Sequence, residues 1–93
     1  MDDKQIERIS RALADPHRIR ILKAVKDQEW MQCAAIIDMI DLTQPAISHH
    51  LKQLTEADLL IAEKEGRNIK YMVNREVLTA YKEFLGQIAG KTP

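Results

Sequence analysis

The stretch Leu42–Leu54 reads LTQPAISHHLKQL and predicts a helix with two chemically different faces. Thr43 is a favourable N-cap, and Pro45 falls in the first turn, where a missing amide proton costs no hydrogen bond. The large apolar residues recur at positions i, i+4 and i+7, and they are Ile47, Leu51 and Leu54. These side chains share one face of a helix, so we expect them to be buried and the opposite face to be polar and exposed.

The exposed face carries side chains that can bind base edges or phosphates of DNA. They are Thr43, Gln44, Ser48, His49 and Lys52. The Gln44 amide can pair bidentately with adenine, Lys52 suits guanine or phosphate, and a good bidentate contact discriminates by about 1–3 kcal/mol. We therefore predict a helix that reads a major groove, with an ordinary solvated helix face as the alternative. His50, at the edge of the buried face, is predicted to be a hydrogen-bonded boundary residue.

Three further helices are predicted upstream from apolar residues at helical spacing. They run from Asp3 to about Ala14, from Pro16 to about Asp27, and from Met31 to Ile40. Asp15 is a good N-cap for the second helix, with Pro16 as its first residue. Only Asp41 and Leu42 separate the third helix from the segment above, and two helices joined by so tight a turn are typical of a helix-turn-helix.

Downstream of Asp58 the apolar period changes from helical to alternating, which predicts two short strands. The polar, glycine-containing stretch Glu65–Asn68 separates them, as in a β-hairpin. Asn74 then caps a last helix, which Gly90 and Pro93 end. The order α-α-α-α-β-β-α predicts a mainly α winged helix-turn-helix in a single domain that covers residues 1–93.

The predicted hairpin, or wing, carries three cations that can contact DNA, namely Lys64, Arg67 and Lys70. Arg67 lies at the tip beside Gly66, where it can reach a minor groove or a phosphate. Glu63 and Glu65 alternate with these cations and weaken the local positive field. The alternative is an exposed hairpin of mixed charge without a partner.

The overall charge is balanced, with 14 basic and 14 acidic residues. Nucleic-acid binders are usually more basic, so a protein-interaction module without DNA binding stays open as an alternative. Many carboxylates nevertheless lie outside the reading helix and the wing, and Arg18, Arg20 and Lys23 of the second helix could contact phosphates or solvent. The sequence shows no nucleophile–base pair, carboxylate cluster or phosphate loop, which argues against an enzyme.

The first and last helices carry apolar stripes that a core of this size cannot fully cover, so we expect a homodimer through these helices. The predicted interface residues are Ile6, Ile9, Leu13, Val77, Leu78, Tyr81, Phe84, Leu85 and Ile88. The two reading helices would then enter successive major grooves roughly 34–36 Å apart.

Three motifs in order give the chain a resemblance to the ArsR/SmtB transcriptional repressors. They are ALADPHRIRIL at residues 12–22, the stretch Leu42–Leu54, and GRNIKY at residues 66–71. The resemblance implies a homodimeric repressor that binds an imperfect inverted repeat in double-stranded promoter DNA and leaves it when an inducer binds. It also implies DNA contacts at Gln44, Ser48, His49 and Arg67.

The metal sites of that family do not carry over. Cys33 is the single cysteine, no thiol lies two residues from it, and the last predicted helix has neither His nor Cys. We expect no metal and no cofactor, with Cys33 as a small buried core residue beside Ile36, Ile37 and Ile40. The alternative is an atypical metal or redox sensor that uses Cys33. The absence of an apolar leader or a long apolar run predicts a soluble cytoplasmic protein without a membrane partner.

Overall fold

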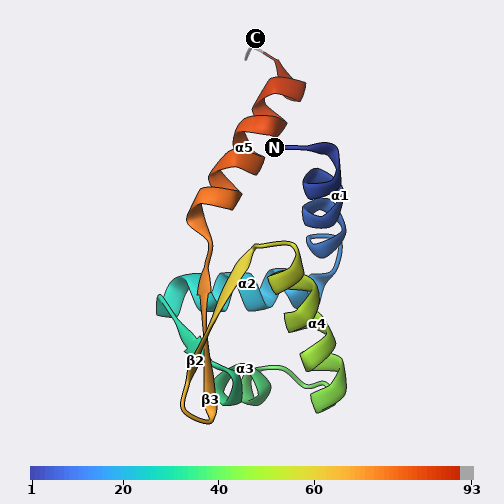
Figure 1. The fold of residues 1–93 in the computed structure, drawn as a ribbon. Coiled ribbons are helices and arrows are strands. Elements are labelled where there is room, and N and C mark those ends of the chain that lie inside the picture. The colour runs from blue at the N-terminus through green and yellow to red at the C-terminus, as the bar shows by residue number, and fades with distance from the viewer. Residues whose placement is uncertain (91–93) are drawn as a thin grey trace.

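The computed structural model describes residues 1–90, which form five helices and a three-stranded antiparallel sheet (Figure 1). In chain order the elements are α1 (Asp3–Ala12), α2 (Pro16–Gln28), β1 (Met31–Gln32), α3 (Cys33–Met39), α4 (Gln44–Glu56), β2 (Leu60–Glu65), β3 (Asn68–Val73) and α5 (Arg75–Ala89). The arrangement confirms the predicted winged helix-turn-helix. Gly90 caps α5 as predicted, whereas Pro93 lies outside the described residues.

Side chains close to each helix start explain where the helices begin. The Asp15 carboxylate accepts hydrogen bonds from the backbone amides of His17 and Arg18 at 2.8 and 3.2 Å. Thr43 Oγ1 and Asn74 Oδ1 each accept a bond from the amide three residues ahead, both at 3.3 Å. All three predicted caps are therefore confirmed, and they satisfy amides that have no partner inside their helices.

The first strand of the sheet was not predicted, and it corrects the predicted element order. Met31 and Gln32 pair with Tyr71 and Lys70 of β3, so the sheet order is β1-β3-β2 and α3 begins only at Cys33. A two-residue strand is too short for any periodicity to show, and its pairing depends on a strand some 40 residues later in the chain. The predicted helix from Met31 to Ile40 was wrong at its first two residues.

The wing is a hairpin with a turn of two residues. Glu65 pairs with Asn68, which leaves Gly66 and Arg67 as the turn. Gly66 has φ +61° and is the first central residue of the turn, the position at which a type II′ hairpin turn requires glycine. Arg67 is consequently held at the very tip of the wing.

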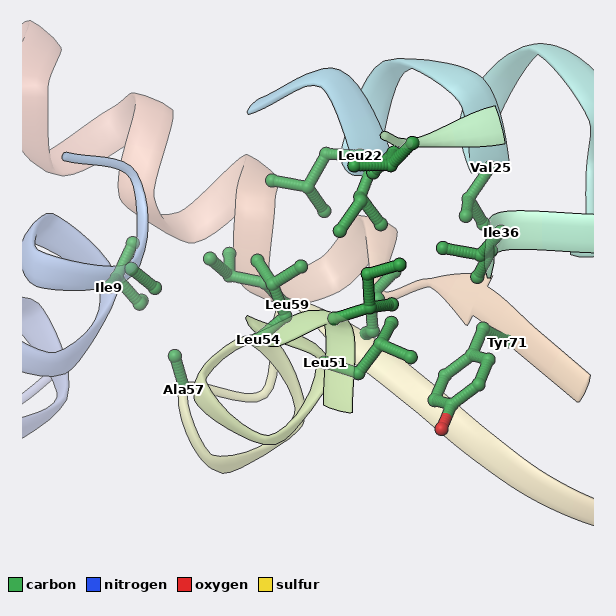
Figure 2. Packing of buried hydrophobic residues seen from close by; sticks show 14 residues of the cluster. Ile9, Leu22, Val25, Ile36, Leu51, Leu54, Ala57, Leu59 and Tyr71 are labelled. Atoms are coloured by element: carbon green, nitrogen blue, oxygen red, sulfur yellow. The ribbon is translucent and has the colours of Figure 1, made fainter. Parts of the chain in front are cut away.

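The core gathers side chains from four helices and the sheet (Figure 2). Ile47 and Leu54 of α4 are fully buried and Leu51 is 3% exposed, as the helical spacing predicted. Figure 2 shows Leu51, Leu54 and Leu59 between Ile9 on one side and Tyr71 on the other. The reading helix is thus held through its apolar face to the rest of the domain.

The last helix is the least buried element. None of its residues is fully buried, and it extends away from the sheet at the end of the molecule that also holds α1 (Figure 1). Leu85 is 47% exposed and Ile88 is 70% exposed. Among the described residues, no helix combines the length and the apolar character needed to span a membrane.

Candidate nucleic-acid interface

The start of α4 and the tip of the wing lie at the same end of the molecule, opposite to the free end of α5 (Figure 1). The tight turn Ile40–Thr43 connects α3 to α4, and the two-residue turn places Arg67 at the wing tip. Two elements far apart in the sequence therefore present their exposed ends in the same direction.

The polar residues of α4 face outward as predicted. Gln44, Ser48, His49 and Lys52 are all exposed, and so is the cap residue Thr43. Because Gln44, Ser48 and Lys52 are four residues apart, their side chains form one row along the helix. The row combines an amide, a hydroxyl and an ammonium group, and these can bind base edges and phosphates.

The cation of this row has a carboxylate close to it. Lys52 Nζ lies 3.9 Å from Glu56 Oε1, one turn further along the helix. Both side chains are more than half exposed, so the ion pair contributes at most about 1 kcal/mol. Lys52 can therefore leave Glu56 and bind a DNA phosphate at little cost.

The three wing cations do not form one patch. Lys64 pairs across the hairpin with Ile69, whereas Lys70 pairs with Glu63, so the two lysines point to opposite faces. Lys70 Nζ lies 4.7 Å from the centre of the Trp30 ring and 3.9 Å from Glu65 Oε1, and its side chain is 25% exposed. Lys70 is therefore the least available wing cation, while Lys64 and Arg67 are exposed.

Arg18 is a residue of α2, and its side chain links α2 to α1 and to the reading helix α4. Its guanidinium donates to the carbonyls of Ala12 at 2.7 Å and Arg11 at 3.0 Å, and it contacts His50 Nδ1 at 3.1 Å. Because a guanidinium only donates, His50 Nδ1 must accept, so His50 is neutral with its proton on Nε2. This confirms His50 as a hydrogen-bonded boundary residue and gives Arg18 a structural partner in place of a phosphate.

Two titratable groups near this contact have shifted pKa values. Burial holds the pKa of His50 below its ordinary value of 6.5, the Asp15 carboxylate opposes that shift, and Arg18, His17 and His49 reinforce it. Burial acts to raise the pKa of Asp15, but hydrogen bonds from the Arg18 and His17 amides lower it overall. The cluster thus favours a neutral His50 beside an ionised Asp15.

His50→Asn is expected to make the free energy of unfolding depend less on pH below about pH 6.5. In the wild type the unfolded chain protonates His50 near its ordinary pKa, 6.5, while the folded chain does not. The contribution of neutral His50 to the free energy of unfolding is therefore fully present above pH 6.5, and it is lost as the pH falls towards the lowered pKa. Urea unfolding at about pH 5 and about pH 7.5 measures this difference.

Asn at position 50 offers an oxygen that can accept the Arg18 bond but does not titrate. His49→Asn is the matched control, because it removes an exposed imidazole from the same helix and only the smallest of the contributions that lower the pKa of His50, so it should keep most of the wild-type pH dependence. An undiminished loss of stability at acid pH in His50→Asn would disprove the role of this imidazole.

The predicted interface residues differ in how far one chain buries them. Ile9 is fully buried within one chain, so it has no surface left for a partner, and its assignment to the interface is corrected. Leu13, Val77, Leu78 and Tyr81 are partly buried against the core, whereas Leu85 and Ile88 are largely exposed. Ser10, which was not predicted, contacts the Tyr81 hydroxyl at 2.8 Å and joins α1 to α5.

Cys33 is the first residue of α3 and is half-buried, packed against the edge of the core, which corrects the prediction of a buried residue. Within residues 1–90 no group of three or more His, Cys, Asp or Glu side chains is arranged to hold a metal ion.

Comparison with known proteins identifies the family. The model of the bacterial regulatory proteins of the arsR family matches residues 15–62, more than half of the chain. The arsenical resistance operon repressor of Staphylococcus xylosus is 32% identical over 84% of this chain and 74% of its own length. The transcriptional repressor SdpR of Bacillus subtilis is 33% identical over 75% of this chain and 77% of its own length.

The fold agrees with this result. A crystal structure of an ArsR family transcriptional regulator superposes with a TM-score of 0.86 at 22% identity, covering 96% of this chain and 91% of that one. At that identity the likeness shows the fold, and the sequence matches show the family. This chain belongs to the arsR family of bacterial regulatory proteins and is a DNA-binding transcriptional regulator, not an enzyme.

Proposed function

We propose that the protein is a dimeric cytoplasmic repressor that binds an inverted-repeat operator in double-stranded DNA through α4 and the wing. The observation that carries the proposal is the exposed row Gln44, Ser48 and Lys52, presented at the same end of the molecule as Arg67. Gln44 and Ser48 read base edges in the major groove, joined by His49. Lys52, Lys64 and Arg67 bind backbone phosphates, with Thr43 at the helix start, and Lys70 contributes least.

The dimer in this proposal forms through α1 and α5. Leu85 and Ile88 leave large apolar surface in water, and no residue of α5 is fully buried. Exposed apolar side chains grouped on one helix are typical of an interface. A two-fold axis there would place two copies of α4 at half-sites about 34–36 Å apart.

The proposal includes no arsenical or other metal response. A relative is named for arsenical resistance, but this chain contributes one thiol, whereas soft metal ions take two or three soft ligands. Cys33 is also the only thiol of the sequence, and thiol-based redox switching usually needs a second thiol to resolve the oxidised sulfur. We therefore expect release from DNA, if it is regulated, to respond to another kind of signal.

The direct test is binding of the purified protein to the DNA upstream of its own coding sequence, by footprinting and by titration between about 50 and 200 mM salt. With 6–10 phosphate contacts the affinity should fall by about 10³–10⁵ over this range. Protection should cover two half-sites on the same side of the duplex. If no footprint appears, or if the affinity does not change with the salt concentration, the result favours a protein-interaction module instead.

A further inference from the structure

Trp30 is a large aromatic side chain that the fold leaves 46% exposed, directly before β1. It is the single tryptophan of the chain, and it belongs neither to the hydrophobic core nor to the apolar side chains packed against that core. Its ring instead contacts a cation, because Lys70 Nζ lies 4.7 Å from the ring centre. The negative face of an indole ring attracts an ammonium group at that distance. Trp30 therefore contributes to the structure through Lys70 and not through the core.

Strand register brings these two residues together. Gln32 pairs with Lys70, and Trp30 lies two residues before Gln32, so strand geometry directs it towards the face that carries Lys70. Glu63 pairs with Lys70 from the other side, and Glu65 follows two residues later on the same face. The Lys70 ammonium group reaches this residue as well, with Nζ 3.9 Å from Glu65 Oε1. Lys70 thus lies between the ring of Trp30 and the last residue of β2.

The wing extends beyond the part of the sheet that has three strands. The row Gln32, Lys70 and Glu63 is the last one in which all three strands pair. Beyond it only β2 and β3 continue, and residues 64–69, here called the tip segment, are all exposed. A two-stranded ribbon without a packed face is marginally stable by itself. The orientation of the tip segment therefore depends on side-chain contacts at its base.

Glu65 is the residue through which such a contact can reach the turn. It ends β2 and directly precedes Gly66 and Arg67, the two residues of the turn. Its carboxylate would also repel the phosphates that Arg67 is proposed to bind. Lys70 offsets this negative charge and links Glu65 to the three-stranded part of the sheet.

We propose that Trp30 is a positioning residue of the wing, because its ring holds the Lys70 ammonium group beside Glu65 and so fixes the orientation in which the turn presents Arg67. The assignment rests on the proposed function and deepens it, since Trp30 and Lys70 act through the turn and not by touching the duplex. With the contact in place, the tip segment is already ordered before DNA binds. Without it, binding must supply the free energy of ordering, and the affinity falls.

The first test compares Trp30→Leu with Trp30→Phe in titrations with operator DNA. A cation over an aromatic ring at an exposed site is worth about 2–5-fold in affinity for each wing, so a Trp30→Leu dimer should bind about 5–25-fold more weakly. Phenylalanine keeps an aromatic face for Lys70 and should restore most of the affinity. The slope of log affinity against log salt concentration should stay that of the wild type, because no cation is removed.

Ile61→Thr is the matched control. Ile61 is also 46% exposed and lies on the same face of the sheet, but it pairs with Met72 instead of Lys70, so this variant should keep the wild-type affinity. Thermal unfolding checks that each variant is folded. Because Trp30 is the single tryptophan, its fluorescence reports the contact directly: Lys70→Met removes a charge 4.7 Å from the ring centre and should shift the emission of the free protein. An unchanged emission would argue that the contact does not exist in solution and overturn the proposal.

A double-mutant cycle with Arg67→Ala determines whether Trp30 acts through the turn. If the ring positions Arg67, Trp30→Leu should lower the affinity much less in the Arg67→Ala background than in the wild type. An equal loss in both backgrounds would show that Trp30 acts elsewhere and overturn the proposal. Wild-type affinity in Trp30→Leu, or no recovery in Trp30→Phe, would overturn it as well.

Failure of the proposed function gives a different result. If the wild type does not bind the operator, or binds it with an affinity that is independent of salt, DNA binding itself is disproved and the role of Trp30 with it. If the wild type binds with the expected salt dependence and the cycle shows no coupling between Trp30 and Arg67, only the role of Trp30 is overturned.

Discussion

A Leu85→Asp/Ile88→Asp variant is expected to sediment as a monomer and to bind the operator at least 100-fold more weakly than the wild type. Leu85 and Ile88 are 47% and 70% exposed in one chain, so the substitutions remove little of its own core. At a two-fold interface they would bury unpaired carboxylates close to their own symmetry copies, which is costly. Losing the second half-site removes an avidity gain of about 10²–10⁴.

The control for this variant is Thr79→Asp/Gln87→Asp, which adds two carboxylates to the opposite, exposed face of the same helix. It should remain a dimer and keep the wild-type affinity. Sedimentation velocity measures the oligomeric state, and a titration with operator DNA measures the affinity. A dimeric Leu85→Asp/Ile88→Asp protein would rule out α5 as the interface.

Gln44→Ala/Ser48→Ala is expected to remove the preference for the operator over unrelated DNA. A bidentate amide–adenine contact is worth about 1–3 kcal/mol, and a dimer makes it twice, so the preference should fall at least about 30-fold. The salt dependence should not change, because no cation is removed. Stability should also hold, because both side chains are exposed and the Thr43 cap is retained.

The matched control removes an amide and a hydroxyl elsewhere. Thr79→Ala/Gln87→Ala affects exposed residues of α5 and should keep both the preference and the affinity. Competition between labelled operator and unrelated duplex measures the preference directly. A Gln44→Ala/Ser48→Ala protein that still discriminates as the wild type does would place base reading on other residues.

Much of the reading helix could be predicted because its signals are local. The Thr43 cap, the position of Pro45 and the spacing of Ile47, Leu51 and Leu54 all lie within 12 consecutive residues. Helical geometry then determines which side chains share a face, whatever the rest of the chain does. The wing turn was equally local, since Gly66 is the residue that a tight hairpin needs.

The contacts that link the reading helix and the wing to the rest of the domain could not be predicted from local patterns. Arg18 donates to two helices other than its own, and no pattern within residues 15–28 indicates that its partners are the end of α1 and His50. Lys70 lies over Trp30 because β1 pairs with β3, and β1 itself is too short to leave a periodic pattern.

The sequence by itself therefore determined the helices, the wing and the outward row Gln44, Ser48 and Lys52, because caps, turns and apolar periodicity act between near neighbours. Only the tertiary structure decided that Lys64 and Lys70 point apart, that His50 is held neutral by Arg18, and that the cations of α1 adjoin the end of α4. The physical reason is that these relations depend on strand register and helix packing, which bring together residues far apart in the chain.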